Sequence, residues 1–319
     1  MAVHAFLFPG QGSQAPGMAR ELAAAFPAAR EVLEEVDDAL GQHLSRLMAE
    51  GPAEELTLTE NAQPALLAHA MAVVRVLERD GGRHVAATAA VVAGHSLGEY
   101  AAIAAAGGFA VADAARLLKL RGQAMQRAVA PGEGAMAALL GAEMAQATAV
   151  CEEAAATPSG GREVIGVAND NGGGQVVVSG HAGAVERAIE IAKANGIRRA
   201  MKLPVSAPFH CALMAPAADV MAEALARTPP RAPLVPVIAN VTAAKVTDPA
   251  TMARLLVEQV TATVRWRESV LAMAALGVDS FIELGSGKVL TGLMKRLLPE
   301  ARALAAGTPA EVEELIKIL

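Results

Sequence analysis

Short apolar runs alternate with longer amphipathic segments along most of the chain, a pattern that predicts an α/β fold. The apolar runs predict strands at residues 4–8, 86–93, 235–239 and 280–283. Apolar residues at helical spacing predict helices at residues 18–40 (broken near Pro27), 63–79, 97–106 and 111–129. Two further helices are predicted to begin at Asp248-Pro249 and at Thr308-Pro309, because each pair joins a capping residue to a proline.

The middle of the chain follows a different order of elements. Its pattern predicts a strand (135–140), a helix (143–155), two strands (164–169 and 175–179), a helix (182–195) and a strand (199–203). This βαββαβ order is typical of a ferredoxin-like unit. Glycines and prolines flank it at both ends. We therefore expect a small domain, residues 132–204, inserted into a large α/β domain made of residues 1–131 and 205–319.

Composition narrows the class of protein. The 319 residues carry a net charge of −6, which argues against nucleic-acid binding, since that function requires a basic face. The longest stretch without a polar or charged side chain is about a dozen residues, short of the roughly 18 that span a membrane. The N-terminus shows no export signal, and the two cysteines, Cys151 and Cys211, form no disulfide framework. We expect a cytoplasmic enzyme that binds neither nucleic acid nor membrane.

Residues 94–98 have the pattern G-x-S-x-G, with a predicted buried strand before them and a predicted helix after them. This context is that of a nucleophile elbow, in which a sharp turn lifts the serine, here Ser96, to the start of a helix. There the helix dipole favours developing negative charge. The alternative is a glycine-rich turn whose serine only caps the helix.

A serine nucleophile needs a base, and the chain has seven histidines. His95 adjoins Ser96 and should diverge from it, and His4 lies in a predicted strand. Four others are expected at the surface: His43, His69, His84 and His181. His210 lies in the irregular, proline-containing segment 203–214 and is the candidate base, although a purely structural histidine is the alternative. Cys211 beside it could act as a thiol nucleophile, but free cysteines are usually buried apolar residues.

Five motifs occur in order along the chain: Phe8–Gln14, Gly94–Tyr100, Arg121–Gln126, Pro208–Met214 and Gly287–Gly292. With them the chain resembles the malonyl-CoA:acyl carrier protein transacylases, a family that includes the acyltransferase units of polyketide synthases. The resemblance runs from about residue 5 to residue 298. It implies a hydrolase-like large domain with a parallel sheet and a ferredoxin-like insert, in agreement with the pattern above.

The resemblance also implies roles for single residues. Ser96 would accept the acyl group and His210 would be its base. The main-chain N–H groups of Gln11 and Leu97 would form the oxyanion hole, and the main-chain carbonyl of Gln259 would orient the histidine. Glu99 is interpreted as a charge at the start of a helix, not as a catalytic acid.

Arg121 would bind the malonyl carboxylate, because a planar guanidinium can hold both carboxylate oxygens at once. Phe209 would limit the room at the malonyl α-carbon and so disfavour methylmalonyl groups, and Met125 would line the pocket. The chain departs from the family pattern at Ser286, at Gly173-Gly174 and at Thr263, where prolines are usual.

No phosphate-binding glycine motif and no metal-ligand spacing is present, so no metal or other cofactor is expected. Carrier proteins of this kind are acidic, so docking on this acidic chain needs a local basic patch. The candidates are Arg198, Arg199, Lys202, Lys288, Lys295 and Arg296, with scattered solvated charge as the alternative.

The sequence thus predicts an acyltransferase that moves a malonyl group from malonyl-CoA to the phosphopantetheine thiol of acyl carrier protein. The reaction would pass through a malonyl-serine intermediate, and the chain is expected to act as a monomer. The alternatives are a trans-acting polyketide-synthase acyltransferase, a serine hydrolase or thioesterase, and a non-catalytic module that binds carrier proteins.

Overall fold

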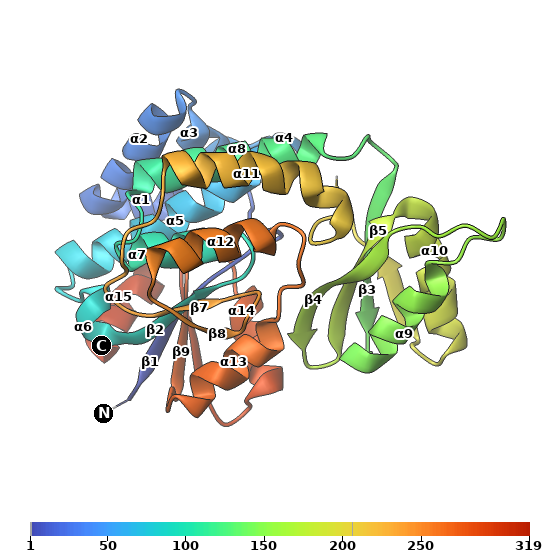
Figure 1. Cartoon of the computed structure of the whole chain (residues 1–319). Coiled ribbons are helices and arrows are strands. Elements are labelled where there is room, and N and C mark those ends of the chain that lie inside the picture. The colour runs from blue at the N-terminus through green and yellow to red at the C-terminus, as the bar shows by residue number, and fades with distance from the viewer. Residues whose placement is uncertain (1, 206) are drawn as a thin grey trace.

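The computed structural model describes residues 2–205 and 207–319, and its larger part is built on a six-stranded sheet (Figure 1). The strand order is β10-β9-β1-β2-β7-β8, and every neighbouring pair is parallel except β7 and β8. The strands are β1 (His4–Phe8), β2 (Ala89–Gly94), β7 (Val237–Ala239), β8 (Ala244–Val246), β9 (Ser280–Leu284) and β10 (Arg302–Ala306).

Helices cover both faces of this sheet, which explains why residues 5–8 of β1 and all of β2 are apolar. Alternate residues of β1 point to opposite faces: Phe6 and Phe8 join one apolar cluster, while Ala5 and Leu7 join the other. The first cluster includes residues of α2 (Pro27–Leu40), α5 (Thr59–Arg79), α7 (Gly98–Ala105), α8 (Val111–Arg127), α11 (Ala215–Arg227) and α12 (Pro249–Gln259). The second includes residues of α13 (Trp266–Ala275) and α14 (Val289–Leu297).

Shorter helices and the C-terminal helix complete this part of the chain. They are α1 (Arg20–Ala25), α3 (Leu44–Glu50), α4 (Ala53–Thr57), α6 (Val85–Thr88), the 3-10 turn η1 (Ala212–Met214) and α15 (Pro309–Ile318). Thr308 caps α15 and Asp248 caps α12, each through its side-chain oxygen, as the sequence predicts. Among the described residues, no helix combines the length and apolar character needed to cross a membrane.

The smaller sheet is antiparallel, with the order β4-β5-β3-β6. Its elements are β3 (Gly134–Leu140), α9 (Met144–Ala154), β4 (Ile165–Gly172), β5 (Gln175–His181), α10 (Ala182–Ala194) and β6 (Arg199–Lys202). This is the chain order and the strand order of a ferredoxin-like unit. The predicted fold class, a parallel α/β sheet with a second antiparallel unit, is confirmed.

The smaller sheet is attached to the larger part along β4, its outer strand. Val264 donates its N–H to Ala168 O (2.9 Å) and accepts from Asp170 N–H (3.0 Å), which extends the sheet by one bridge. The Thr263 hydroxyl donates to Val167 O (2.6 Å), so this departure from the usual proline gives a further hydrogen bond. We call residues 259–267 the strap, because they link the end of α12 to the smaller sheet.

The other two departures also have local reasons. Gly173 and Gly174 have φ values of 58° and 72°, which proline cannot adopt. The Ser286 hydroxyl donates to Ser13 O (2.6 Å) and so joins the loop after β9 to the loop after β1.

Candidate active site

Ser96 lies on the sharp turn between β2 and α7. Its φ of 54° is in the left-handed region, an uncommon conformation for a residue with a side chain. The flanking glycines make the turn possible: a Cβ on Gly94 would lie 1.9 Å from the main chain of Gly98, and a Cβ on Gly98 would lie 2.2 Å from Phe8 O. The serine is therefore held at the carboxyl end of a central strand and at the start of a helix.

His210 lies beside this serine although the two are far apart in the sequence. Its Nε2 is 2.8 Å from Ser96 Oγ, and its Nδ1 is 2.8 Å from the main-chain oxygen of Gln259. Nδ1 therefore carries the proton and donates it to the carbonyl, which leaves Nε2 as an acceptor for the serine hydroxyl. Burial, and then the positive charge of Arg121, lower the pKa of His210 to about 3, so the imidazole is neutral at physiological pH.

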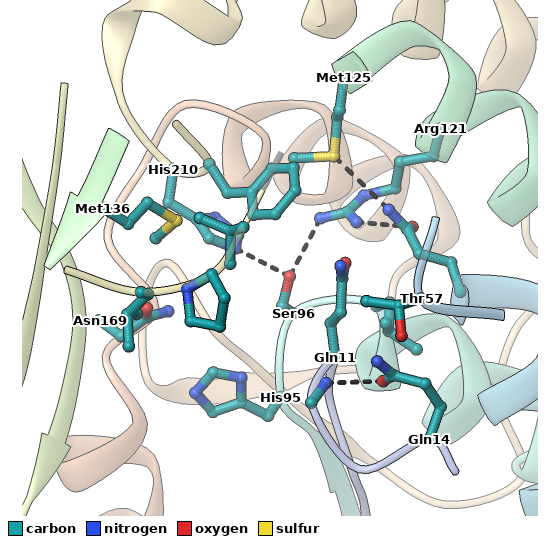
Figure 2. A pocket seen from close by; sticks show the side chains of 17 residues that line it. Gln11, Gln14, Thr57, His95, Ser96, Arg121, Met125, Met136, Asn169 and His210 are labelled. Carbon is teal, nitrogen blue, oxygen red and sulfur yellow. Dashed lines mark hydrogen bonds between the residues drawn. The ribbon is translucent and has the colours of Figure 1, made fainter. Parts of the chain in front are cut away.

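Ser96 and His210 face a cavity of about 330 Å³ (Figure 2). Gln11 and Leu97 also line it. Within residues 2–205 and 207–319, the main-chain N–H groups of Gln11 and Leu97 donate to no acceptor. Two main-chain N–H groups without an acceptor, lying beside a candidate nucleophile, can bind a developing oxyanion.

Arg121 reaches the same cavity from α8, and its side chain is only 1% exposed. Nη1 donates to Gln63 Oε1 (2.8 Å), while Nη2 donates to Gln259 Oε1 (2.9 Å) and to Ser96 Oγ (3.2 Å). Figure 2 shows the guanidinium pointing toward Ser96. Among the described residues its hydrogen bonds go only to neutral acceptors, and it lies over the Tyr100 ring at 5.8 Å, so a buried cation faces the cavity without a direct counter-ion.

Phe209 and Met125 also line the cavity, as the sequence predicts. Met125 Sδ accepts from Gln63 Nε2 at 3.7 Å. Gln63 was not predicted as a site residue from the sequence. No local pattern marks it: most residues of α5 are buried, and Gln63 reaches Arg121 because α5 packs against α8.

A buried polar network lies beneath the serine turn. Glu99 lies in the first turn of α7, as the sequence predicts, but its carboxyl group belongs to this network and does not face solvent. Glu99 is 2% exposed and accepts from Asn240 N–H (3.0 Å) and Gln259 Nε2 (2.7 Å). Burial raises the pKa of Glu99 to about 7. Asn240, also not predicted, accepts the N–H of Ser96 at its Oδ1 (2.8 Å). Its position directly after a strand of the sheet is the signal that could have identified it.

The other histidines lie away from Ser96 Oγ. His95 Nε2 is 2.8 Å from Asn171 Oδ1 in β4, so its ring diverges from the serine. The prediction that His69 lies at the surface is wrong: the side chain is buried, and its Nε2 is 2.9 Å from Gly307 O. The apolar spacing of α5 continues through His69, which explains its burial.

The candidate docking residues are all exposed, but they differ in their partners. Lys202 pairs with Glu186, Lys288 pairs with Glu311, and Arg296 donates to Gln175 Oε1. Among the described residues, Arg198, Arg199 and Lys295 form no ion pair. Within residues 2–205 and 207–319, no three His, Cys, Asp or Glu side chains are grouped so that they could hold a metal ion.

An α/β sheet that presents a serine at the strand–helix turn, with a neutral imidazole on its hydroxyl, is characteristic of enzymes that form acyl-serine intermediates. Comparison with known proteins narrows this class. Residues 5–314 match the acyl transferase domain family, and the chain belongs to that family. The resemblance inferred from the motifs is thereby confirmed.

The relatives are similar over the whole chain. The malonyl CoA-acyl carrier protein transacylase of Escherichia coli (strain K12) is 46% identical over 318 residues, which cover 100% of both chains. The crystal structure of acyl-carrier-protein-S-malonyltransferase from Bartonella henselae is 52% identical, covers 99% of both chains and gives a TM-score of 0.95. A malonyl-transacylase solved in complex with its type II PKS acyl-carrier protein is 40% identical over 100% of both chains, with a TM-score of 0.94.

Proposed function

We propose that this acyltransferase moves a malonyl group from malonyl-CoA to the phosphopantetheine thiol of an acyl carrier protein. The observation that carries the proposal is Arg121, a buried guanidinium that points into the cavity of Ser96 and, among the described residues, donates hydrogen bonds only to neutral acceptors. Such a group favours an acyl chain that ends in a carboxylate and penalises one that leaves the cation unpaired. The names of the relatives, which are malonyl transferases, support the same substrate.

In the first half-reaction, His210 Nε2 removes the proton from Ser96 Oγ as the oxygen attacks the thioester carbon. The carbonyl oxygen becomes an oxyanion, which the N–H groups of Gln11 and Leu97 bind. The C–S bond then breaks, and the proton on His210 passes to the CoA sulfur. The result is a malonyl ester of Ser96 and free CoA.

In the second half-reaction, the phosphopantetheine thiol of the carrier protein gives its proton to His210 and attacks the ester. The C–O bond to Ser96 breaks, and the proton returns to the serine oxygen. A thioester is exchanged for a thioester, so no cofactor or energy source is needed. CoA leaves before the carrier protein reacts, which gives ping-pong kinetics.

The test is mass spectrometry of the protein after incubation with malonyl-CoA alone. A stable single malonyl adduct on the peptide that contains Ser96 is expected. Rapid multiple turnover to free malonate would instead favour a hydrolase or thioesterase, and the absence of any adduct or turnover would favour a non-catalytic binding module.

The pathway is a separate question from the chemistry. A trans-acting polyketide-synthase acyltransferase would use the same residues, and the solved relative bound to a type II PKS carrier protein keeps this alternative open. Turnover with carrier proteins of both pathways would separate the two, since only the second acceptor differs.

The rate of acylation should keep its neutral-pH value well below pH 6.5. The base acts only when His210 is neutral, that is, above its pKa, which burial and Arg121 lower to about 3. The malonyl carboxylate also stays ionised, because ordinary carboxyl groups titrate near pH 4. Single-turnover acylation measured between about pH 5 and pH 8 checks this. A half-maximal rate near pH 6.5, the ordinary histidine value, would contradict the lowered pKa.

Reversing Arg198 and Arg199 to Glu should raise the KM for the carrier protein about tenfold and leave the rate of acylation by malonyl-CoA unchanged. Arg198 precedes β6 and Arg199 begins it. Both are exposed and form no ion pair among the described residues, so they can meet an acidic partner. The control reverses Arg30 and Arg46, exposed arginines of α2 and α3 far from the smaller sheet (Figure 1), which pair with Glu34 and Glu50. An equal rise in KM for both double variants would show a general charge effect and no local patch.

A further inference from the structure

Glu99 is a buried carboxyl group that the mechanism above does not use. It lies in the first turn of α7, yet its side chain turns inward, away from solvent. Its Oε2 accepts both Asn240 N–H (3.0 Å) and Gln259 Nε2 (2.7 Å). Burying a carboxyl group lowers the stability of the fold unless the group is hydrogen-bonded. Its hydrogen-bond partners therefore indicate which groups it holds in place.

Gln259 is the residue through which Glu99 reaches the site. The main-chain oxygen of Gln259 accepts from His210 Nδ1, its Oε1 accepts from Arg121 Nη2, and its Nε2 donates to Ser96 O (3.0 Å) as well as to Glu99. One residue therefore contacts the candidate base, the candidate acyl-binding cation and the backbone of the candidate nucleophile.

The side-chain amide of Gln259 can occupy this place in only one orientation. If the amide were flipped, its NH₂ group would face the Arg121 guanidinium and its oxygen would face Glu99 Oε2 and Ser96 O. Donors would then meet donors and acceptors would meet acceptors. Because Glu99 presents an acceptor to Gln259, it selects the orientation that gives Arg121 its oxygen partner.

We propose that Glu99 is a positioning residue that fixes Gln259 and, through it, His210, Ser96 and Arg121. In a catalytic triad the acid accepts directly from the imidazole. Here Gln259 lies between the imidazole of His210 and the carboxyl group of Glu99. The proposal concerns the position of the Glu99 oxygen, not its charge. It rests on the proposed roles of Ser96 and His210 as nucleophile and base.

Two substitutions separate the effect of the position of the Glu99 oxygen from the effect of its charge. Glu99→Gln keeps the length of the side chain and one oxygen that can accept both hydrogen bonds, but removes the charge. Glu99→Asp keeps the charge but withdraws the oxygens by about one bond length, ~1.5 Å. A fluorophosphonate reagent, which labels nucleophilic serines whatever their natural substrate, measures the reactivity of Ser96 in each full-length variant.

Labelling of the Glu99→Asp variant is expected to be about 10- to 100-fold slower than that of the unsubstituted protein. Labelling of the Glu99→Gln variant should fall much less. The proton NMR resonance of His210 Nδ1–H, which reports its hydrogen bond to Gln259 O, should shift in the Asp variant and stay close to its original position in the Gln variant.

Glu283 provides the matched control, because its carboxyl group is also buried and accepts from Leu290 N–H, Thr291 N–H and the Thr291 hydroxyl. Glu283→Asp should lower the melting temperature without slowing labelling of Ser96. The proposal is wrong if Glu99→Asp labels at the original rate with an unmoved resonance, if Glu99→Gln is slower than Glu99→Asp, or if Glu283→Asp slows labelling equally.

The malonyl proposal can fail independently. An unsubstituted protein that reacts with fluorophosphonate but forms no adduct with malonyl-CoA would refute the substrate and leave the role of Glu99 in place.

Discussion

Replacing Ser96 with Ala should lower acyl transfer by at least about 10⁴-fold, because the variant lacks the oxygen that carries the covalent intermediate in the proposed mechanism. The hydroxyl is the only atom of the turn that contacts both His210 Nε2 and Arg121 Nη2 among the described residues. The alanine side chain fits the same turn, so the fold should persist. Steady-state transfer to a carrier protein, together with mass spectrometry after malonyl-CoA, measures both the rate and the adduct.

Cys211→Ala is the control for this result, because Cys211 is the other nucleophile near His210. Its thiol is buried and donates to Pro208 O, and burial raises its pKa, so it is a poor nucleophile. The Cys211→Ala variant should still form the malonyl adduct. An adduct that survives in Ser96→Ala and disappears in Cys211→Ala would transfer the role of nucleophile to the thiol.

Replacing Arg121 with Ala should lower the preference for malonyl-CoA over acetyl-CoA by about tenfold to a hundredfold. A charge-assisted contact with a carboxylate contributes roughly 1.5–3 kcal/mol, which corresponds to a factor of that size. The variant also removes the unpaired buried cation that penalises an acetyl group, so activity on acetyl-CoA should rise relative to malonyl-CoA. The ratio of kcat/KM for the two thioesters measures the change.

Arg116→Ala is the matched control, since Arg116 lies on the same helix but is exposed and pairs with Asp113. Its ratio of kcat/KM values should equal that of the unsubstituted protein. A malonyl preference that persists in Arg121→Ala would remove Arg121 from the acyl pocket and leave the carboxylate without an assigned partner.

The sequence predicts most of the fold because apolar periodicity is strong in its long helices and buried strands. It fails where that signal is weak. Strand β10 contains three alanines in five residues and was not predicted, and the three-residue strand β8 is too short to show alternation. The predicted helix 63–79 begins too late: α5 begins at Thr59 and continues through Pro64, which lies in its second turn.

The candidate site divides along the same physical line. Ser96 and His210 are predictable because the serine turn and the irregular histidine segment have local sequence patterns. Gln63 and Asn171 have no such pattern, since each acts through contacts between segments far apart in the chain. Asn240 has only its place directly after a strand to mark it, and its contact with Ser96 N–H is also between distant segments. The burial of Glu99 and His69 was missed for a related reason: helical spacing alone does not say which polar side chain finds a buried partner.

The strap has a consequence for any attempt to exchange the smaller sheet between relatives. Thr263 and Val264 are hydrogen-bonded to β4, and Gln259, at the other end of the strap, accepts from His210 Nδ1. A graft that replaced residues 132–204 alone would pair a foreign edge strand with the original residues 263 and 264. A mismatch there would displace the strap and with it the Gln259 carbonyl that accepts from His210 Nδ1. A chimera should therefore take residues 132–204 and the strap from the same parent.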